Sequence, residues 1–179
     1  MTASASASDR PHRLPRETLL DVIRHTPLVS IDLICRDPQG RLLLGWRSNR
    51  PAQASWFVPG GRILKDERIE QAIERIAADE LGLPTAQAAQ ARPFGVYQHL
   101  YPDNFAGEPG LSTHYVVLAW TLALPADTPL KGDAQHRELR WFTPAELLAD
   151  TQVHANTRAY VDSTVAGPRT AASATHSVG

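Results

Sequence analysis

Apolar and β-branched residues gather in short runs along the chain, and turn residues separate the runs. Runs of this length and composition are typical of strands. Six runs predict strands, at residues 28–37, 41–48, 56–58, 94–101, 114–124 and 138–142. The turn sequence DPQG joins the first two runs into a hairpin. Because helical segments are interspersed among so many strands, the order favours a mixed α/β sandwich over an alternating parallel sheet.

Three segments have the pattern of helices. The first, residues 16–26, is short and amphipathic. The second runs from 67 to 81, with Asp66 as its N-cap and Gly82 as its C-terminal stop. The third follows Thr143, an N-cap residue with proline directly after it.

Glu80 lies on the apolar stripe of the helix predicted at 67–81. It follows Ile73 by seven residues and Ile76 by four, and both spacings return to the same helix face. An ionised carboxylate on a packed face is costly unless a cation meets it. Either a cation binds there, or the helix ends early and Glu80 is in water. Other acidic residues point away from the stripe and are expected to be solvated: Glu67, Glu70 and Glu74.

The composition suits one globular domain. The chain has 179 residues, of which 42% are hydrophobic. The small-residue segments at the two ends have little apolar surface to bury. We therefore expect disordered tails at 1–15 and 166–179, and a single domain at 16–165.

The charge and the single cysteine limit the class of partner. A net charge of -1 gives no general attraction to nucleic acid or to an anionic membrane. No apolar run has the length of a secretory signal or a membrane span, so we expect a soluble, cytoplasmic protein. Cys35, among apolar neighbours, reads as a buried structural thiol.

A turn before the central helix contains Pro59, Gly60 and Gly61. Glycines let a backbone approach a ligand closely, although most turns of this kind are only turns. Mg²⁺ prefers oxygen ligands such as carboxylates and carbonyls. Glu80 and the carbonyl of Gly60 are therefore two candidate ligands for a divalent cation.

The same region closely resembles the signature of Nudix hydrolases. Six positions match at the expected spacing: Gly61, Glu67, Arg75, Glu80, Gly82 and Leu83. Two positions differ, because Ile76 stands in place of the glutamate after the arginine, and Asp79 in place of the penultimate glutamate. In ordinary members those carboxylates help to hold several metal ions, so the departures imply a depleted metal site.

Within that superfamily, the chain is similar to the GDP-mannose mannosyl hydrolases from about Leu19 to Tyr160. The likeness includes the stretches TPLVSIDLI, LLLGWRSNRPAQASWFVPGGR, FGVYQHLYPDNF and VHANTRAY. It implies a Nudix-type α/β/α sandwich with a mixed β-sheet, and a homodimer that uses one Mg²⁺. It also implies hydrolysis of GDP-mannose, or GDP-glucose, at the sugar C1 with inversion, releasing GDP and free sugar.

The resemblance also assigns roles to residues that bind the metal and the diphosphate. It places three ligands on the Mg²⁺, namely Glu80, the Gly60 carbonyl and the Gln135 side chain. It places Arg47 and Arg62 near the diphosphate, where a guanidinium binds bidentately. Tyr115 would add a hydrogen bond.

Further roles concern the sugar end of the substrate. His136 is the candidate general base for water, since histidine titrates near neutrality. Asp32 is expected to contact sugar hydroxyls or to assist that base. His99 is a second possible base or sugar contact, with packing as an equal alternative. Arg75 is expected to orient acidic partners such as Asp79, four residues later.

Two other functions remain open at this stage. One is an ordinary Nudix pyrophosphatase, which attacks phosphorus and yields GMP and a sugar phosphate. Ile76 speaks against it, whereas Asp79 keeps one acidic position. The other is a nucleotide-sugar binding module without turnover.

Overall fold

The computed structural model describes residues 13–125, 127–131 and 136–162. The tails predicted to be disordered lie almost entirely outside this range. The described elements, in chain order, are α1 (Arg16–His25), β1 (Leu28–Arg36), β2 (Leu42–Arg47), β3 (Ser55–Phe57), β4 (Gly60–Arg62), α2 (Ile69–Leu81), α3 (Thr85–Ala88), β5 (Arg92–Tyr101), β6 (Thr113–Ala123), β7 (His136–Phe142), α4 (Pro144–Ala149) and α5 (Ala155–Arg158).

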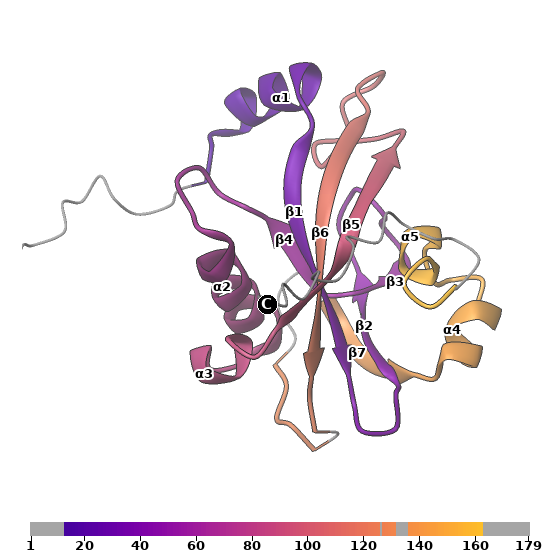
Figure 1. Ribbon diagram of the computed structural model, residues 1–179. Helices are drawn as coiled ribbons and strands as arrows, with labels where there is room; N and C mark the ends of the chain where they lie inside the picture. The colour runs from indigo at the N-terminus through magenta and orange to yellow at the C-terminus, as the bar shows by residue number, and fades with distance from the viewer. Residues whose placement is uncertain (1–12, 126, 132–135, 163–179) are drawn as a thin grey trace, which may run out of the picture.

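The strands of the described residues form one mixed sheet in the order β3-β2-β1-β6-β5, with β4 paired to β1 and β7 paired to β2. The β1 and β6 strands run parallel, and β5 pairs antiparallel with β6. Figure 1 shows α2 and α3 on one side of the sheet and α4 and α5 on the other. The prediction of an α/β sandwich with a mixed sheet is confirmed.

The central strand β1 contributes side chains to both layers of the core. Ile31, Leu33 and Cys35 pack into the cluster that contains the apolar face of α2. Ile34 packs into the opposite cluster, with residues of α4. Successive strand residues point to opposite faces, so Asp32 shares the face of Ile34. Burial raises the pKa of the Cys35 thiol to about 12, which agrees with a structural thiol.

The start of α2 differs from the prediction. The helix begins at Ile69 and not at residue 67, and Arg68 is its N-cap. Asp66, expected to be the N-cap, has a φ of 64° and lies in the preceding turn. The C-terminal prediction is confirmed, since Gly82 ends the helix in the left-handed conformation at φ 68°. At α4, the predicted N-cap is also confirmed, because the Thr143 side chain accepts a hydrogen bond from the amide of Glu146.

Three short elements were not predicted from the sequence. The glycine segment read as a turn forms strand β4, which pairs antiparallel with β1. The helices α3 and α5 have four residues each, too few to show a helical period. The longest described helix, α2, has 13 residues. None of the helices in the described part of the chain is long and apolar enough to cross a membrane.

Candidate active site

A pocket of about 550 Å³ opens where β1, β2, β4, β5 and β6 meet the end of α2. This central pocket has the size of sites that take small molecules. Eight of the ten residues proposed from the sequence line it: Asp32, Arg47, Gly60, Arg62, Arg75, Glu80, His99 and Tyr115. The other two are Gln135, which lies outside the described residues, and His136.

The lining of the central pocket is cationic although the chain is nearly neutral. Five arginines contribute to it, namely Arg13, Arg47, Arg50, Arg62 and Arg75. They face three carboxylates, on Asp32, Asp79 and Glu80. Guanidinium groups bind phosphate oxygens through charge-assisted hydrogen bonds. The pocket therefore suits a ligand that carries several negative charges.

Arg47 has a buried donor that the described residues leave unsatisfied. Its Nε atom has no hydrogen-bond partner among them. The guanidinium lies over the ring of Phe57, with its central carbon 5.6 Å from the ring centroid. Because a buried donor without a partner is unfavourable, Arg47 fits a site completed by an anionic ligand.

Glu80 is buried, which decides between the two readings of its position. The residue is 4% exposed and belongs to α2, so the helix does not end early. Its Oε2 atom accepts a hydrogen bond from the amide of Gly60 at 2.8 Å. The strand β4 and the last turn of α2 thus hold this carboxylate at the pocket.

The backbone of Gly60 faces the same side as Glu80. The β1 strand hydrogen-bonds to Pro59 and Ile63, through Leu33 and Val29. Hydrogen-bonding groups alternate along an antiparallel strand, so the amide and the carbonyl of Gly60 turn away from β1. A Cβ atom on Gly60 would lie 2.6 Å from the carbonyl oxygen of Ile31, so only glycine fits here.

These donors fit a hard divalent cation held partly by its ligand. Glu80 supplies a carboxylate and Gly60 a carbonyl, which are the oxygen donors Mg²⁺ prefers. Among the described residues, no group of three or more His, Cys, Asp or Glu side chains forms a complete metal site. An ion bound here would therefore take further oxygens from phosphate or water.

Arg75 pairs with a different carboxylate from the one expected. Its Nε and one terminal nitrogen bind both oxygens of Glu67, at 2.6 and 2.8 Å. The same terminal nitrogen donates to the Arg62 carbonyl. The expectation that Glu67 is solvated was wrong, since its side chain is 2% exposed. Glu67 precedes α2, so the helical period does not predict where its side chain points. Asp79, the expected partner, contributes only a weaker charge interaction with Arg75.

Asp32 has a partner that the sequence did not suggest. The Tyr160 hydroxyl donates to its Oδ2 atom at 2.6 Å. Burial raises the pKa of Asp32 to about 7, and the Tyr160 hydrogen bond and the charge of Arg47 oppose that rise. This side chain therefore exchanges a proton near neutral pH while it lines the pocket.

His99 lies beside this pair. Its Nε2 atom is 3.4 Å from the Tyr160 oxygen, and its Nδ1 atom is 4.0 Å from Asp32 Oδ2. Burial lowers the pKa of His99 to about 4, so the imidazole is neutral at physiological pH. The ring also packs edge-on against Phe57. His99 both lines the pocket and packs in the core.

The remaining proposed residues lie around the same site. Burial lowers the pKa of Arg62, and the charge of Tyr115 partly opposes this shift. Burial raises the pKa of Tyr115, and the charge of Arg62 partly opposes that shift. His136 is the first residue of β7, and its backbone pairs with Arg47 in β2. The structure therefore brings the His136 backbone next to a pocket residue, while its side chain lies outside the description.

Tyr160 is the main residue that sequence reasoning missed. It belongs to the stretch VHANTRAY, which resembles the hydrolase family. An aromatic residue at the end of such a stretch is expected only to pack in the core. The ring does pack, with its centroid 4.9 Å from that of Tyr97. Only the fold shows that its hydroxyl hydrogen-bonds to Asp32 on β1, which is far from Tyr160 in the sequence.

The model of the NUDIX domain matches residues 26–162, which include the pocket and most of the sheet. The chain belongs to the Nudix family. The chain is also similar in sequence to the low-salt glycan biosynthesis protein Agl8 of Haloferax volcanii. It is 36% identical over 145 residues, which are 80% of this chain and 89% of that protein.

Solved Nudix structures share the fold at lower identity. The MutT Nudix hydrolase of Burkholderia pseudomallei has a TM-score of 0.60 and 23% identity, over 76% of this chain and 97% of that one. The Nudix domain of Shewanella oneidensis NrtR, solved with ADP ribose, has a TM-score of 0.57 and 18% identity. That match covers 82% of this chain and 96% of the other. These likenesses concern the Nudix fold alone.

Proposed function

We propose that this Nudix hydrolase cleaves GDP-mannose, or GDP-glucose, to GDP and free sugar by attack of water at the anomeric C1. The reaction inverts the anomeric centre and uses one Mg²⁺. The observation that carries the proposal is the burial of Ile76 on the pocket side of α2.

Ile76 occupies the position directly after Arg75, where ordinary Nudix enzymes carry a further carboxylate. It is fully buried, and a Cβ atom on Gly61 would lie 3.2 Å from its Cγ1 atom. This part of the pocket wall is therefore apolar. Within the described part of α2, Asp79 and Glu80 supply the carboxylates that line the pocket. Of these two, only Glu80 is buried, and a single buried carboxylate on α2 favours one metal ion over the several that attack at phosphorus uses.

Hydrolysis at C1 needs a base on the face of the sugar opposite the leaving group. The oxygen of water forms the new bond to C1 while the bond from C1 to the diphosphate oxygen breaks. The base accepts the proton of the water, and GDP leaves with the bonding electron pair. His136 is the proposed base, and Asp32 with His99 would hold the sugar hydroxyls.

The leaving group is a diphosphate, and its charge grows as the C1–oxygen bond breaks. Arg47 and Arg62 would bind its oxygens, and the unsatisfied Nε of Arg47 supports this role. Glu80, the Gly60 carbonyl and Gln135 would hold the Mg²⁺, which supplies positive charge to the departing diphosphate.

The relative from Haloferax volcanii supports a sugar-related substrate. The name of that protein refers to glycan biosynthesis, and the match with it covers 80% of this chain. Nucleotide sugars are the activated donors from which glycans are made. A nucleotide-sugar substrate would thus agree with both the cationic pocket and this relative.

Product analysis tests the proposal. The protein is incubated with GDP-mannose and Mg²⁺, and the nucleotides are resolved by anion-exchange chromatography. GDP with free mannose is the expected result, and Glu80→Gln should abolish most of it. GMP with mannose 1-phosphate would instead show a pyrophosphatase, and absence of any nucleotide product would leave a binding module.

A further inference from the structure

Two loops that the proposed mechanism does not use contribute to the wall of the central pocket. One joins β2 to β3, and five of its residues line the pocket: Ser48, Asn49, Arg50, Pro51 and Gln53. The other joins β5 to β6 and spans residues 102–112. It contributes Phe105 to the pocket, between contributions from Tyr101 and Thr113 at its two ends.

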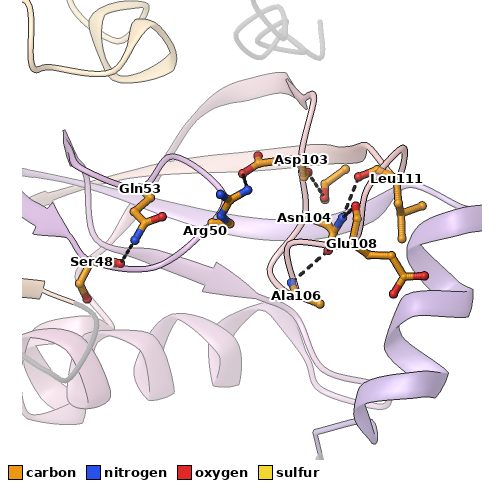
Figure 2. Close-up of polar contacts among 9 residues, drawn as sticks. Ser48, Arg50, Gln53, Asp103, Asn104, Ala106, Glu108 and Leu111 are labelled. Atoms are coloured by element: carbon orange, nitrogen blue, oxygen red, sulfur yellow. Dashed lines mark hydrogen bonds and ion pairs between the residues drawn. The ribbon is translucent and has the colours of Figure 1, made fainter.

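The β5–β6 loop is built around a buried asparagine. Asn104 is 0% exposed, and its Nδ2 atom donates to the carbonyls of Glu108 and Leu111, both at 2.8 Å. Its Oδ1 atom accepts from the amides of Ala106 and Glu108, at 3.0 and 3.1 Å. The side chain thus uses its two donor hydrogens and both acceptor positions. Figure 2 shows these contacts drawing the loop around Asn104.

The same loop is tied to β6 and to the β2–β3 loop. The Thr113 hydroxyl donates to the carbonyl of Asp103 at 2.8 Å. The Asp103 carboxylate forms an ion pair with Arg50 at 3.4 Å, which joins the two loops (Figure 2). On the β2–β3 side, Gln53 donates to the Ser48 carbonyl. Both loops are therefore held in place without a ligand.

Phe105 follows Asn104 directly and belongs to the loop that the Asn104 hydrogen bonds organise. The residue is 39% exposed, although large apolar side chains of the described chain are mostly buried. An exposed aromatic ring on the wall of a pocket is a contact surface for a flat ligand group. Nucleobases bind readily to such rings, because every base has a π-face that can stack on an aromatic side chain.

We propose that Phe105 is the stacking platform for the nucleobase of the ligand in the central pocket. The arginines of the pocket account for a diphosphate, and a nucleotide that carries it needs a surface for its base. Asn104 positions the platform, and Arg50 closes the wall from the other loop. The inference rests on the proposed function only in that the ligand is a nucleotide, and not on which bond is cleaved.

Binding measurements separate the base from the diphosphate. The dissociation constants of GDP and of inorganic pyrophosphate, both with Mg²⁺, are measured by calorimetry on the full chain. Three variants are compared with the parent: Phe105→Leu, Phe105→Tyr and Phe94→Leu. Phe94 is a matched control, because it is 41% exposed and does not belong to the pocket lining.

The Phe105→Leu substitution keeps an apolar side chain but removes the aromatic face. It should weaken GDP about tenfold and leave pyrophosphate unchanged, as expected for the loss of one base stack. Phe105→Tyr and Phe94→Leu should bind GDP like the parent. Unchanged GDP binding by Phe105→Leu would overturn the proposal, as would equal weakening of both ligands. A parent protein that binds GDP no better than pyrophosphate would also overturn it. These outcomes are independent of whether turnover yields GDP or GMP.

Discussion

The Tyr160 hydroxyl donates a hydrogen bond of 2.6 Å to Asp32 Oδ2, although the two residues lie 128 positions apart in the chain. The ring of Tyr160 is fixed by Tyr97, and its oxygen also lies near His99. Asp32 and His99 line the central pocket, whereas Tyr160 is not part of its lining. We therefore propose that Tyr160 positions Asp32 through this oxygen and leaves the other carboxylate oxygen for a ligand.

Replacing Tyr160 with phenylalanine should lower turnover more than nucleotide affinity. The substitution keeps the ring and removes a charge-assisted hydrogen bond, which contributes about 1.5–3 kcal/mol. We expect kcat to fall roughly tenfold and the dissociation constant of GDP to stay unchanged, because the proposed contact of Asp32 is with the sugar and not with the nucleotide. Tyr97→Phe is the control in the same ring cluster. Equal loss of kcat and GDP affinity would mean that Tyr160 only supports the fold.

Asp32→Asn should stabilise the protein in a pH-dependent way. The folded-state pKa of Asp32 is about 7 against 3.8 when unperturbed, so the folded protein favours the protonated form. Below about pH 4 the carboxyl group is protonated in both the folded and the unfolded protein, so it does not change the free energy of unfolding. As the pH rises from 4 to 7, the free energy of unfolding falls, by up to roughly 4 kcal/mol. An asparagine carries no such cost. In metal-free buffer the melting temperature of the variant should match the parent near pH 4 and exceed it, on the order of 10 °C, at pH 8. A difference that does not change with pH would contradict this.

The sequence predicted the sheet and the main helix because their cues are local. Runs of apolar and β-branched residues mark β1 and β6, and Gly82 marks the end of α2. Helical period placed Glu80 on the apolar stripe but left open whether the helix ended before it, and the structure shows the residue buried within α2. By contrast, Glu67 precedes the helix, so its ion pair with Arg75 depends on a turn at Asp66 that the pattern does not encode. The Tyr160–Asp32 contact and the Asn104 loop depend on long-range packing, which no local pattern contains.

Glu80→Gln should weaken Mg²⁺ binding, since an amide lacks the charge of a carboxylate. Glu80 is buried beside the Gly60 amide, and that hydrogen bond can persist in the glutamine variant. We expect at least a tenfold higher Mg²⁺ requirement for activity, measured by metal titration. Glu70→Gln, on the exposed face of the same helix, should behave like the parent. An unchanged metal requirement in Glu80→Gln would remove this residue from the metal site.

Glu67→Gln should destabilise the fold. The substitution breaks the bidentate pair with Arg75, whose carboxylate side is almost fully buried. Because Arg75 remains partly exposed, we expect a loss of about 2 kcal/mol, below the value for a fully buried pair. Urea unfolding of this variant and of Glu74→Gln provides the comparison. Identical midpoints would show that the pair contributes nothing to stability.

His136→Gln should lower kcat by about 100-fold while Mg²⁺ affinity stays unchanged, as expected for the loss of a general base. Single-turnover kinetics and a metal titration on the same preparation separate the two effects. His25→Gln, at the end of α1, serves as the control. A parallel loss of metal affinity would make His136 a ligand and not a base.

The position of bond cleavage tests the central claim most directly. GDP-mannose is hydrolysed in ¹⁸O-labelled water with Mg²⁺, and the reaction is quenched rapidly. The ¹⁸O content of each product is then measured by mass spectrometry. Attack at C1 predicts ¹⁸O in the sugar and none in GDP. Label in a phosphate group of GMP or of mannose 1-phosphate would contradict it.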